Sequence, residues 1–153
     1  MDVTQKEQLT EQARDFISQQ AMGVIATVSP NNTPEAATVM YMMDHEWNIY
    51  VLTHEDSQKV QNIKQNPKVA FVIGTTLVAH TVQIRATAEL IDSKHEAFAR
   101  ISQHFASSRQ HTLNPIYKVY EKNYVIIKMT VDWLRYLSFD QLTNKEEYVV
   151  LIP

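Results

Sequence analysis

The sequence predicts a mainly β protein, in which short strands form a small antiparallel β-barrel with helices at its periphery. Short segments rich in β-branched residues alternate with turns containing Pro, Asn, Asp or Gly between residues 22 and 92. Neighbouring strands joined by such short links pair antiparallel. One short helical stretch interrupts this region and two more flank it. We therefore expect a barrel over residues 22–139.

The first helix is expected over residues 4–20, ahead of the barrel. Thr4 and Glu7 have the spacing of a capping box, in which each side chain accepts a free N–H at the helix start. The apolar residues that fall on one face are Leu9, Ala13, Phe16 and Ile17. Such a face must be buried, and the simplest place for it is across the mouth of the barrel.

Alternating and β-branched segments mark the strands of the barrel. They cover residues 23–28, 35–43, 47–53, 69–73, 79–91, 124–129 and 131–139. A short helix separates the third from the fourth, and Asp56 or Ser57 can cap its start. It carries Val60 and Ile63 inward. Asn66-Pro67 ends it, because the residue before a proline disfavours the helical conformation.

The later part of the chain is predicted to add one helix and a tail. Ser93 and Glu96 form a second capping box, and the buried stripe of this helix is Ala97, Phe98, Ile101 and Phe105. Residues 106–114 are expected to form a loop, after which Pro115 opens a short helical turn. Residues 148–152 are apolar enough to pack on the body or on a partner chain. With no repeat or linker, residues 1–153 are interpreted as one domain with a C-terminal tail over 140–153.

Composition limits the possible functions. The chain has 153 residues, a formal charge of -3 and no cysteine, which excludes disulfides, thiolate metal sites and thiol nucleophiles. Lys and Arg are scattered, whereas a nucleic-acid binder needs a concentrated positive field. The sequence contains neither a signal peptide nor an apolar run of about 20 residues. We therefore expect a cytoplasmic protein that binds neither nucleic acid nor membrane.

Several common site motifs are missing from the sequence. No two of the six histidines have the i, i+4 spacing of a helical metal site, so no metal is expected. Gly23 and Gly74 are the only glycines. A Gly-x-Ser-x-Gly elbow, a Walker loop and a dinucleotide fingerprint therefore cannot form. A nucleotide ligand would have to be held in another way.

The segment from Thr53 to Lys59, where the third strand meets the short helix, is the leading candidate for a ligand site. A helix N-terminus presents unpaired N–H groups and a partial positive charge, both of which attract phosphate. The Ser57 hydroxyl and the Lys59 ammonium could complete such a site. The alternative, which these residues alone favour, is that Asp56 or Ser57 only caps the helix while Lys59 is solvated.

A second candidate lies on the last predicted strand. Asp132-Trp133-Leu134-Arg135-Tyr136 carries an indole, a guanidinium and a phenol. These groups could stack on a planar ligand or form hydrogen bonds with it. An ordinary amphipathic strand is the alternative interpretation, because aromatic residues are common on strands.

Taken in order, the segments resemble the FMN-binding split-barrel superfamily of pyridoxamine 5'-phosphate oxidase, especially its small general-stress-protein branch. The likeness covers about residues 10–139 and depends on the order and spacing of its segments. These are 23–28, the Asn-rich turn with Pro34, 47–53, 57–63, 66–69, 86–90 and Trp133-Leu134-Arg135-Tyr136. The resemblance implies a six-stranded antiparallel split barrel and a homodimer with two FMN sites at the subunit interface.

The resemblance also implies roles for single residues. Ser57 and Lys59 match ligands of the flavin phosphate, and Thr53 lies on the adjoining strand end. Thr38 and Val39 would face the edge of the isoalloxazine ring through their backbone.

Three further positions complete the implied site. Thr81 stands where the oxidase carries Gln. Trp133 and Arg135 would reach in from the partner subunit.

The sequence departs from the family pattern at three charged positions. Ala37 replaces an Arg of the second strand, Met42 replaces a Lys of that strand, and Gln58 replaces the middle Arg of the helix element. Each charged hydrogen bond lost to a phosphate contributes about 1.5–3 kcal/mol. The missing groups that would hold a substrate phosphate argue against oxidation of pyridoxamine 5'-phosphate itself.

Three functional hypotheses follow from these observations. The first is an FMN-dependent oxidoreductase acting on a small or planar substrate, in which the flavin carries the chemistry. The second is a non-catalytic binding protein for a flavin or for haem, with His80 or His111 as an axial ligand. The third is a stress-associated dimeric module with an empty groove.

Overall fold

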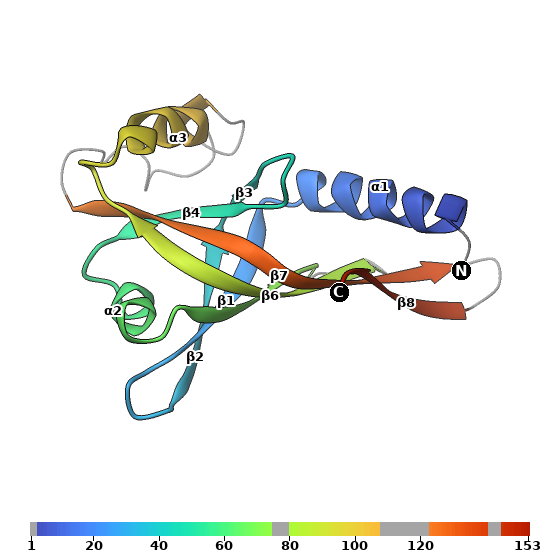
Figure 1. Cartoon of the computed structure of the whole chain (residues 1–153), viewed down its shortest axis with the longest axis horizontal. Helices are drawn as coiled ribbons and strands as arrows, with labels where there is room; N and C mark the ends of the chain where they lie inside the picture. The colour runs from blue at the N-terminus through green and yellow to red at the C-terminus, as the bar shows by residue number, and fades with distance from the viewer. Residues whose placement is uncertain (1–2, 75–79, 108–122, 141–144) are drawn as a thin grey trace.

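The computed structural model describes residues 3–74, 80–107, 123–140 and 145–153. Within these ranges one curled antiparallel sheet of eight strands is accompanied by three helices (Figure 1). The helices are α1 (Val3–Gln19), α2 (Gln58–Gln65) and α3 (Glu96–Ser107). The strands are β1 (Met22–Val28), β2 (Pro34–Met40), β3 (Met42–Met43), β4 (Ile49–His54), β5 (Lys68–Ile73), β6 (His80–Ile91), β7 (Tyr124–Asp140) and β8 (Lys145–Ile152).

The sheet has the order β2-β1-β5-β6-β7-β4-β3, and β8 also pairs with β7. The mainly β class, the antiparallel pairing and the split-barrel type are confirmed, with eight strands where six were expected. The two additional strands are β3, which is separated from β2, and β8, which forms in the predicted C-terminal tail. The first part of β7 pairs with β4 and its last part with β8, while β6 runs beside both parts.

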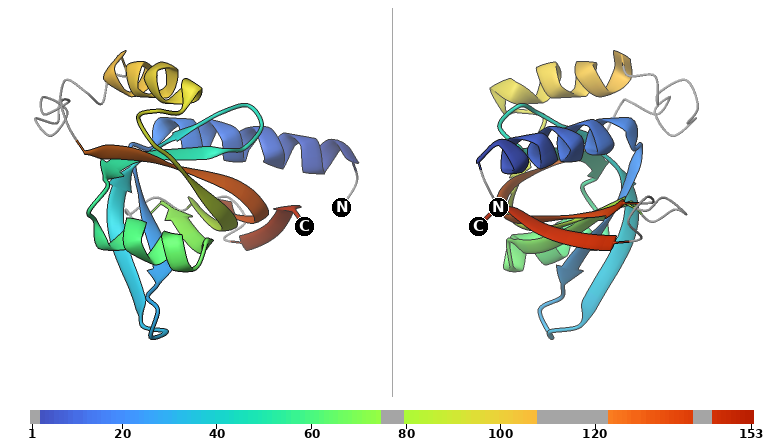
Figure 2. Two further views of the ribbon diagram at one scale, coloured as in Figure 1. Left: turned by 60° about the vertical axis from the view of Figure 1, so that its left-hand side comes forward. Right: turned by 90° about the vertical axis from the view of Figure 1, so that its right-hand side faces the viewer.

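Helix α1 lies along one side of the curled sheet and α2 along another (Figure 2). The predicted apolar face of α1 is confirmed, since its buried residues are Leu9, Ala13, Phe16 and Ile17. They join the inward side chains of the strands, such as Ile25, Phe71 and Ile84, in the main core. Alternation of buried and exposed positions along β5 and β6 places this core on one face of the sheet.

Two predicted strand boundaries are wrong. The strand expected over residues 35–43 is divided at Tyr41, whose buried side chain donates a hydrogen bond to the carbonyl of Ile17 over 2.6 Å. The two strands expected within residues 124–139 are a single strand. A bulge opposite Arg85 and Ala86 adds Asp132 to β7 without a turn, so the strand continues past it.

The two predicted capping boxes are also wrong. Thr4 already lies inside α1, so it is not the residue that caps this helix. Helix α3 begins at Glu96, so His95 rather than Ser93 precedes its first residue, and Nδ1 of His95 accepts the N–H of Ala97. The stripe Ala97, Phe98, Ile101 and Phe105 is confirmed, because these residues pack over Ile91 and Ile126 in a second, smaller core.

The C-terminal segment packs on the body as expected, and it does so as strand β8. Val149 and Leu151 are buried, while Tyr148 and Val150 are exposed. The loop and helical turn predicted over residues 106–119 lie mostly outside the described residues. So does His111.

Candidate functional site

The start of α2 is fixed by the chain on both sides of it. The carbonyl of His54 accepts the N–H of Ser57, and the carbonyl of Ser57 accepts the N–H groups of Val60 and Gln61. Val60 and Ile63 are buried, as the helical spacing predicts, and they hold α2 against the sheet. This anchoring places the side chains of residues 57–59 at the junction between β4 and α2.

Ser57 occupies the N-cap position of α2, but its hydroxyl does not cap the helix. Its Oγ atom is buried and has no hydrogen-bond partner in the described part of the chain. A buried hydroxyl without a partner costs about 1–3 kcal/mol, so such groups are rare in folded proteins. Ser57 therefore occupies the capping position, but its hydroxyl neither caps the helix nor forms another hydrogen bond with the described residues.

Lys59 is partly buried, and its Nζ atom donates a hydrogen bond to Oγ1 of Thr53 over 3.2 Å. Burial lowers the pKa of Lys59, because a charged amine is less stable away from water. None of the ion pairs recorded among the described residues involves it. The interpretation of Lys59 as a fully solvated lysine is therefore wrong. Its ammonium group is therefore not neutralised by a direct ion pair with any described carboxylate.

A cavity of about 340 Å³ opens beside this junction, between α2 and the strands β1 and β2. Its walls are formed by Ile25, Thr27, Glu35, Ala36, Ala37, Gln58 and Lys59. Ala37 and Ile25 are cross-strand partners, so the β2 wall faces the same space as the β1 wall. The fold thus brings together Ala37, Gln58 and Lys59, the three positions at which the resemblance compares this sequence with a phosphate site.

Sequence reasoning missed the residue that organises this cavity, which is Asn62. Its side chain is fully buried, and its Nδ2 atom donates to Oγ1 of Thr27 over 3.0 Å and to Oε2 of Glu35 over 2.7 Å. Its Oδ1 atom accepts the amide of Gln58 over 2.9 Å. The available signal was an asparagine next to the inward-facing Ile63, four residues after a glutamine.

Three other residues that the resemblance assigns to the flavin site, Thr38, Val39 and Thr81, lie outside this cavity. Val39 is buried in the core and Thr38 is exposed on the other side of β2, and neither lines the cavity. Oγ1 of Thr81 donates to the carbonyl of Ile73 over 2.9 Å, so this hydroxyl serves the β5–β6 pairing. Thr81 lines neither of the two cavities described for this fold.

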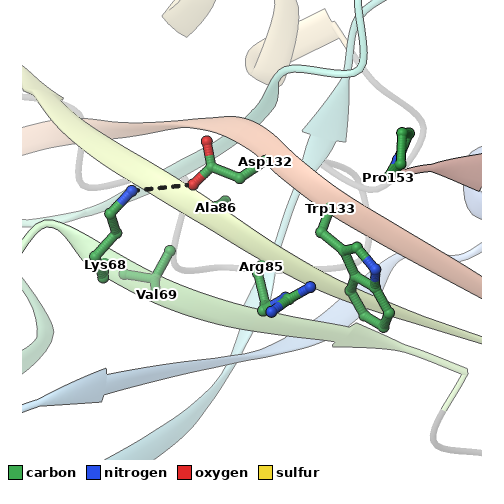
Figure 3. Close-up of a pocket in the computed structure, with 7 residues that line it drawn as sticks. All are labelled: Lys68, Val69, Arg85, Ala86, Asp132, Trp133 and Pro153. Carbon is green, nitrogen blue, oxygen red and sulfur yellow. Dashed lines mark hydrogen bonds and ion pairs between the residues drawn. The ribbon is translucent and has the colours of Figure 1, made fainter.

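Trp133 lines a second and larger cavity of about 490 Å³ on the sheet (Figure 3). Its other walls are Lys68, Val69, Arg85, Ala86, Asp132 and Pro153. The guanidinium of Arg85 lies 4.4 Å from the centre of the indole ring. Lys68 is paired with Asp132 over 3.3 Å, and Thr87 donates to the same carboxylate, which lowers the pKa of Asp132.

Arg135 lies beside this second cavity rather than in its wall. Its guanidinium donates to Gln83 and lies 4.8 Å from the centre of the Tyr148 ring. Trp133 and Arg135 alternate along β7 with the buried Leu134 and Tyr136, so they lie on the face of the sheet away from the core. The two cavities share no wall residue.

The described residues contain neither a cluster of metal ligands nor a membrane-spanning helix. No group of three or more His, Asp or Glu is placed to hold a metal ion there. None of the helices in these ranges is long and apolar enough to cross a membrane. His80 lies 3.1 Å, through Nδ1, from the hydroxyl of Tyr136, and it stacks on that ring.

Comparison with known proteins agrees with the fold. A family model described as pyridoxamine 5'-phosphate oxidase matches residues 9–138. General stress protein 26 of Bacillus anthracis is 24% identical, with 93% of this chain and 98% of that chain covered and a TM-score of 0.68. No match was found among curated proteins.

Two other solved structures are similar at lower identity. A pyridoxamine 5'-phosphate oxidase-related, FMN-binding protein of Nostoc punctiforme is 12% identical, covering 96% of both chains, with a TM-score of 0.65. HutZ, the haem storage protein of Vibrio cholerae, is 14% identical, covering 82% of this chain and 92% of that one, with a TM-score of 0.68. These likenesses show the fold. Because the family model spans most of its length, the chain belongs to the pyridoxamine 5'-phosphate oxidase family of split-barrel proteins.

Proposed function

We propose that this chain binds a flavin at the start of α2, with FMN as the cofactor, and acts as an oxidoreductase on a small or planar substrate. The observation that carries the proposal is the cavity in which Ala37, Gln58 and Lys59 meet. Among the described residues, the neighbouring Ser57 has a buried hydroxyl with no hydrogen-bond partner, and the Lys59 ammonium forms no ion pair. The helix N-terminus adds a partial positive charge at the same point.

The residues present fit one end of a flavin. Ser57 would donate a hydrogen bond to a phosphate or ribityl oxygen, and Lys59 would donate a charge-assisted one. When bound, the flavin supplies hydride transfer, while the protein binds and orients it. The chain's own part is to hold the polar tail of the cofactor between α2 and β2.

We further propose that the working unit is a homodimer with two shared sites. Trp133 and Arg135 lie on the sheet face away from the core. Trp133 lines a different cavity from Lys59, and Arg135 lies beside that second cavity. A single ligand could therefore contact both groups if a second copy brought its β7 against the first. Tyr148 and Val150, which are exposed on the adjacent β8, would be covered by such a contact.

The direct test is titration of ligand-free protein with FMN. We expect quenching of flavin fluorescence and a rise in melting temperature, because a ligand that binds only the folded state stabilises it. If FMN causes neither change, the flavin proposal is wrong. Oxidation of reduced nicotinamide by the complex would support turnover, and binding without turnover would favour the non-catalytic role. A Soret band in protein purified from cells would instead indicate haem.

A further inference from the structure

The cavity beside α2 contains a carboxylate as well as a lysine. Glu35 lies two residues before Ala37 on β2, so both side chains lie on the same side of the strand. Both line the cavity together with Lys59. The charge of Glu35 therefore bears directly on which ligands this space can accept.

Glu35 is held in place by the buried amide of Asn62. That amide donates to Oε2 of Glu35 over 2.7 Å and to Thr27 over 3.0 Å, while Gln58 donates to its oxygen. Asn62 is fully buried and its three partners restrict it to one orientation. The carboxylate is consequently part of the wall and not a freely rotating surface group.

The formal charge of the cavity wall is zero. Lys59 contributes one positive charge and Glu35 one negative charge, and the other wall residues are neutral. The N-terminus of α2 adds roughly half a positive charge. Sites that select for a phosphate dianion instead surround it with several cationic donors. Here a dianion would gain one ammonium group and face one carboxylate.

The same wall suits a chain of hydroxyl groups. Glu35 can accept a hydrogen bond, Lys59 can donate one, and the amide of Gln58 can do either. An alcohol both donates and accepts, so it can satisfy these groups without introducing a like charge beside Glu35. The ribityl chain of a flavin has this chemistry with or without a terminal phosphate.

We propose that the cavity receives the ribityl end of a flavin, and that Glu35 is the residue that removes the usual preference for the phosphate. The protein then binds riboflavin about as tightly as FMN. This inference depends on the proposed flavin function and specifies the ligand class of the same site. Glu35 acts by repulsion, which is a recognised way to set specificity.

The experiment compares the dissociation constants of riboflavin and FMN for ligand-free protein at fixed ionic strength. For the wild type we expect the two constants to lie within about tenfold of each other. Glu35→Gln keeps an oxygen for the Asn62 amide and removes the charge. It should tighten FMN binding by about tenfold and leave riboflavin within about threefold.

Two further variants make the comparison specific. Glu11→Gln removes the same charge from the exposed face of α1, outside the cavity, and should change neither constant. Ala37→Arg adds a cation to the cavity and should restore a strong preference for FMN. A wild-type preference for FMN of more than about a hundredfold, or equal effects of Glu35→Gln on both ligands, would overturn this inference alone. Failure of both flavins to bind would overturn the proposed function and this inference with it.

Discussion

Nζ of Lys59 donates a hydrogen bond to Oγ1 of Thr53 over 3.2 Å, which ties the first turn of α2 to the end of β4. Thr53 is buried and Lys59 is partly buried, so the contact lies where water is restricted. A neutral hydroxyl holds the ammonium in position without neutralising it. Because Lys59 lines the cavity, its charge remains available to a ligand there.

Replacing Lys59 should weaken FMN binding more than riboflavin binding. Lys59→Met keeps most of the aliphatic stem and removes the charge, and a lost charge-assisted hydrogen bond corresponds to about 10-fold or more in affinity. Fluorescence titration with both flavins measures the effect. Lys64→Met, on the exposed part of the same helix, is the matched control and should leave both affinities unchanged. An equal loss for the two flavins would contradict a contact between Lys59 and the phosphate.

The FMN affinity should fall with rising pH because of the same lysine. Burial places the pKa of Lys59 below its ordinary 10.5. Between the lowered value and 10.5 the unfolded chain binds more protons than the folded one, so stability rises with pH in that window. FMN binding has the opposite dependence, because the phosphate is dianionic above about pH 7 and prefers the protonated amine.

The measurement is the ratio of the FMN and riboflavin dissociation constants from about pH 7 toward 10.5, since ring ionisation is common to both ligands. The ratio should rise through the lowered pKa of Lys59 and stay flat in Lys59→Met. A rise of equal size in the variant would assign the effect to another group.

Much of the fold could be predicted because its elements have strong local signals. The inward faces of α1 and α2 follow from the spacing of apolar residues, and both are buried as expected. The errors occur where tertiary contacts override local pattern. Tyr41 divides a β-branched run because its hydroxyl reaches Ile17, and the bulge at Asp132 joins two segments that look separate in sequence.

The candidate site could be predicted only in part, for a similar reason. The start of α2 is visible as a polar junction between a strand and a helix. Glu35 and Asn62, in contrast, are 27 positions apart along the chain, and only the fold brings them into hydrogen-bond contact. Local patterns do not contain that pairing, so sequence reasoning found the lysine of the cavity and missed its carboxylate.

Removing the Asn62 side chain should destabilise the protein without any ligand present. Asn62→Ala leaves the hydroxyl of Thr27 and the carboxylate of Glu35 without their buried donor. Polar groups left without a hydrogen-bond partner in this way lower the free energy of unfolding by about 1–3 kcal/mol. Urea denaturation measures it as a lower midpoint at unchanged slope. Gln65→Ala, on the exposed face of α2, should leave the midpoint unchanged. A loss below about 0.5 kcal/mol would show that water replaces the amide.

The shared site of the proposed homodimer predicts that two defective chains can complement each other. Trp133→Ala alone should weaken flavin binding, because the indole would reach the cofactor of the partner. When Lys59→Met and Trp133→Ala chains are refolded together, about half of the dimers are mixed. Each mixed dimer has one site with an intact Lys59 and an intact Trp133, so about a quarter of all sites should regain wild-type affinity.

The control for complementation pairs Lys59→Met with the double variant Lys59→Met/Trp133→Ala. No site in that mixture can contain Lys59, so no affinity should return. Recovery only in the first mixture requires that each flavin site takes Lys59 from one chain and Trp133 from the other. If neither mixture recovers although both form dimers, Trp133 acts within its own chain. If Trp133→Ala alone left flavin binding unchanged, Trp133 would instead serve a different ligand, because its cavity shares no wall residue with that of Lys59.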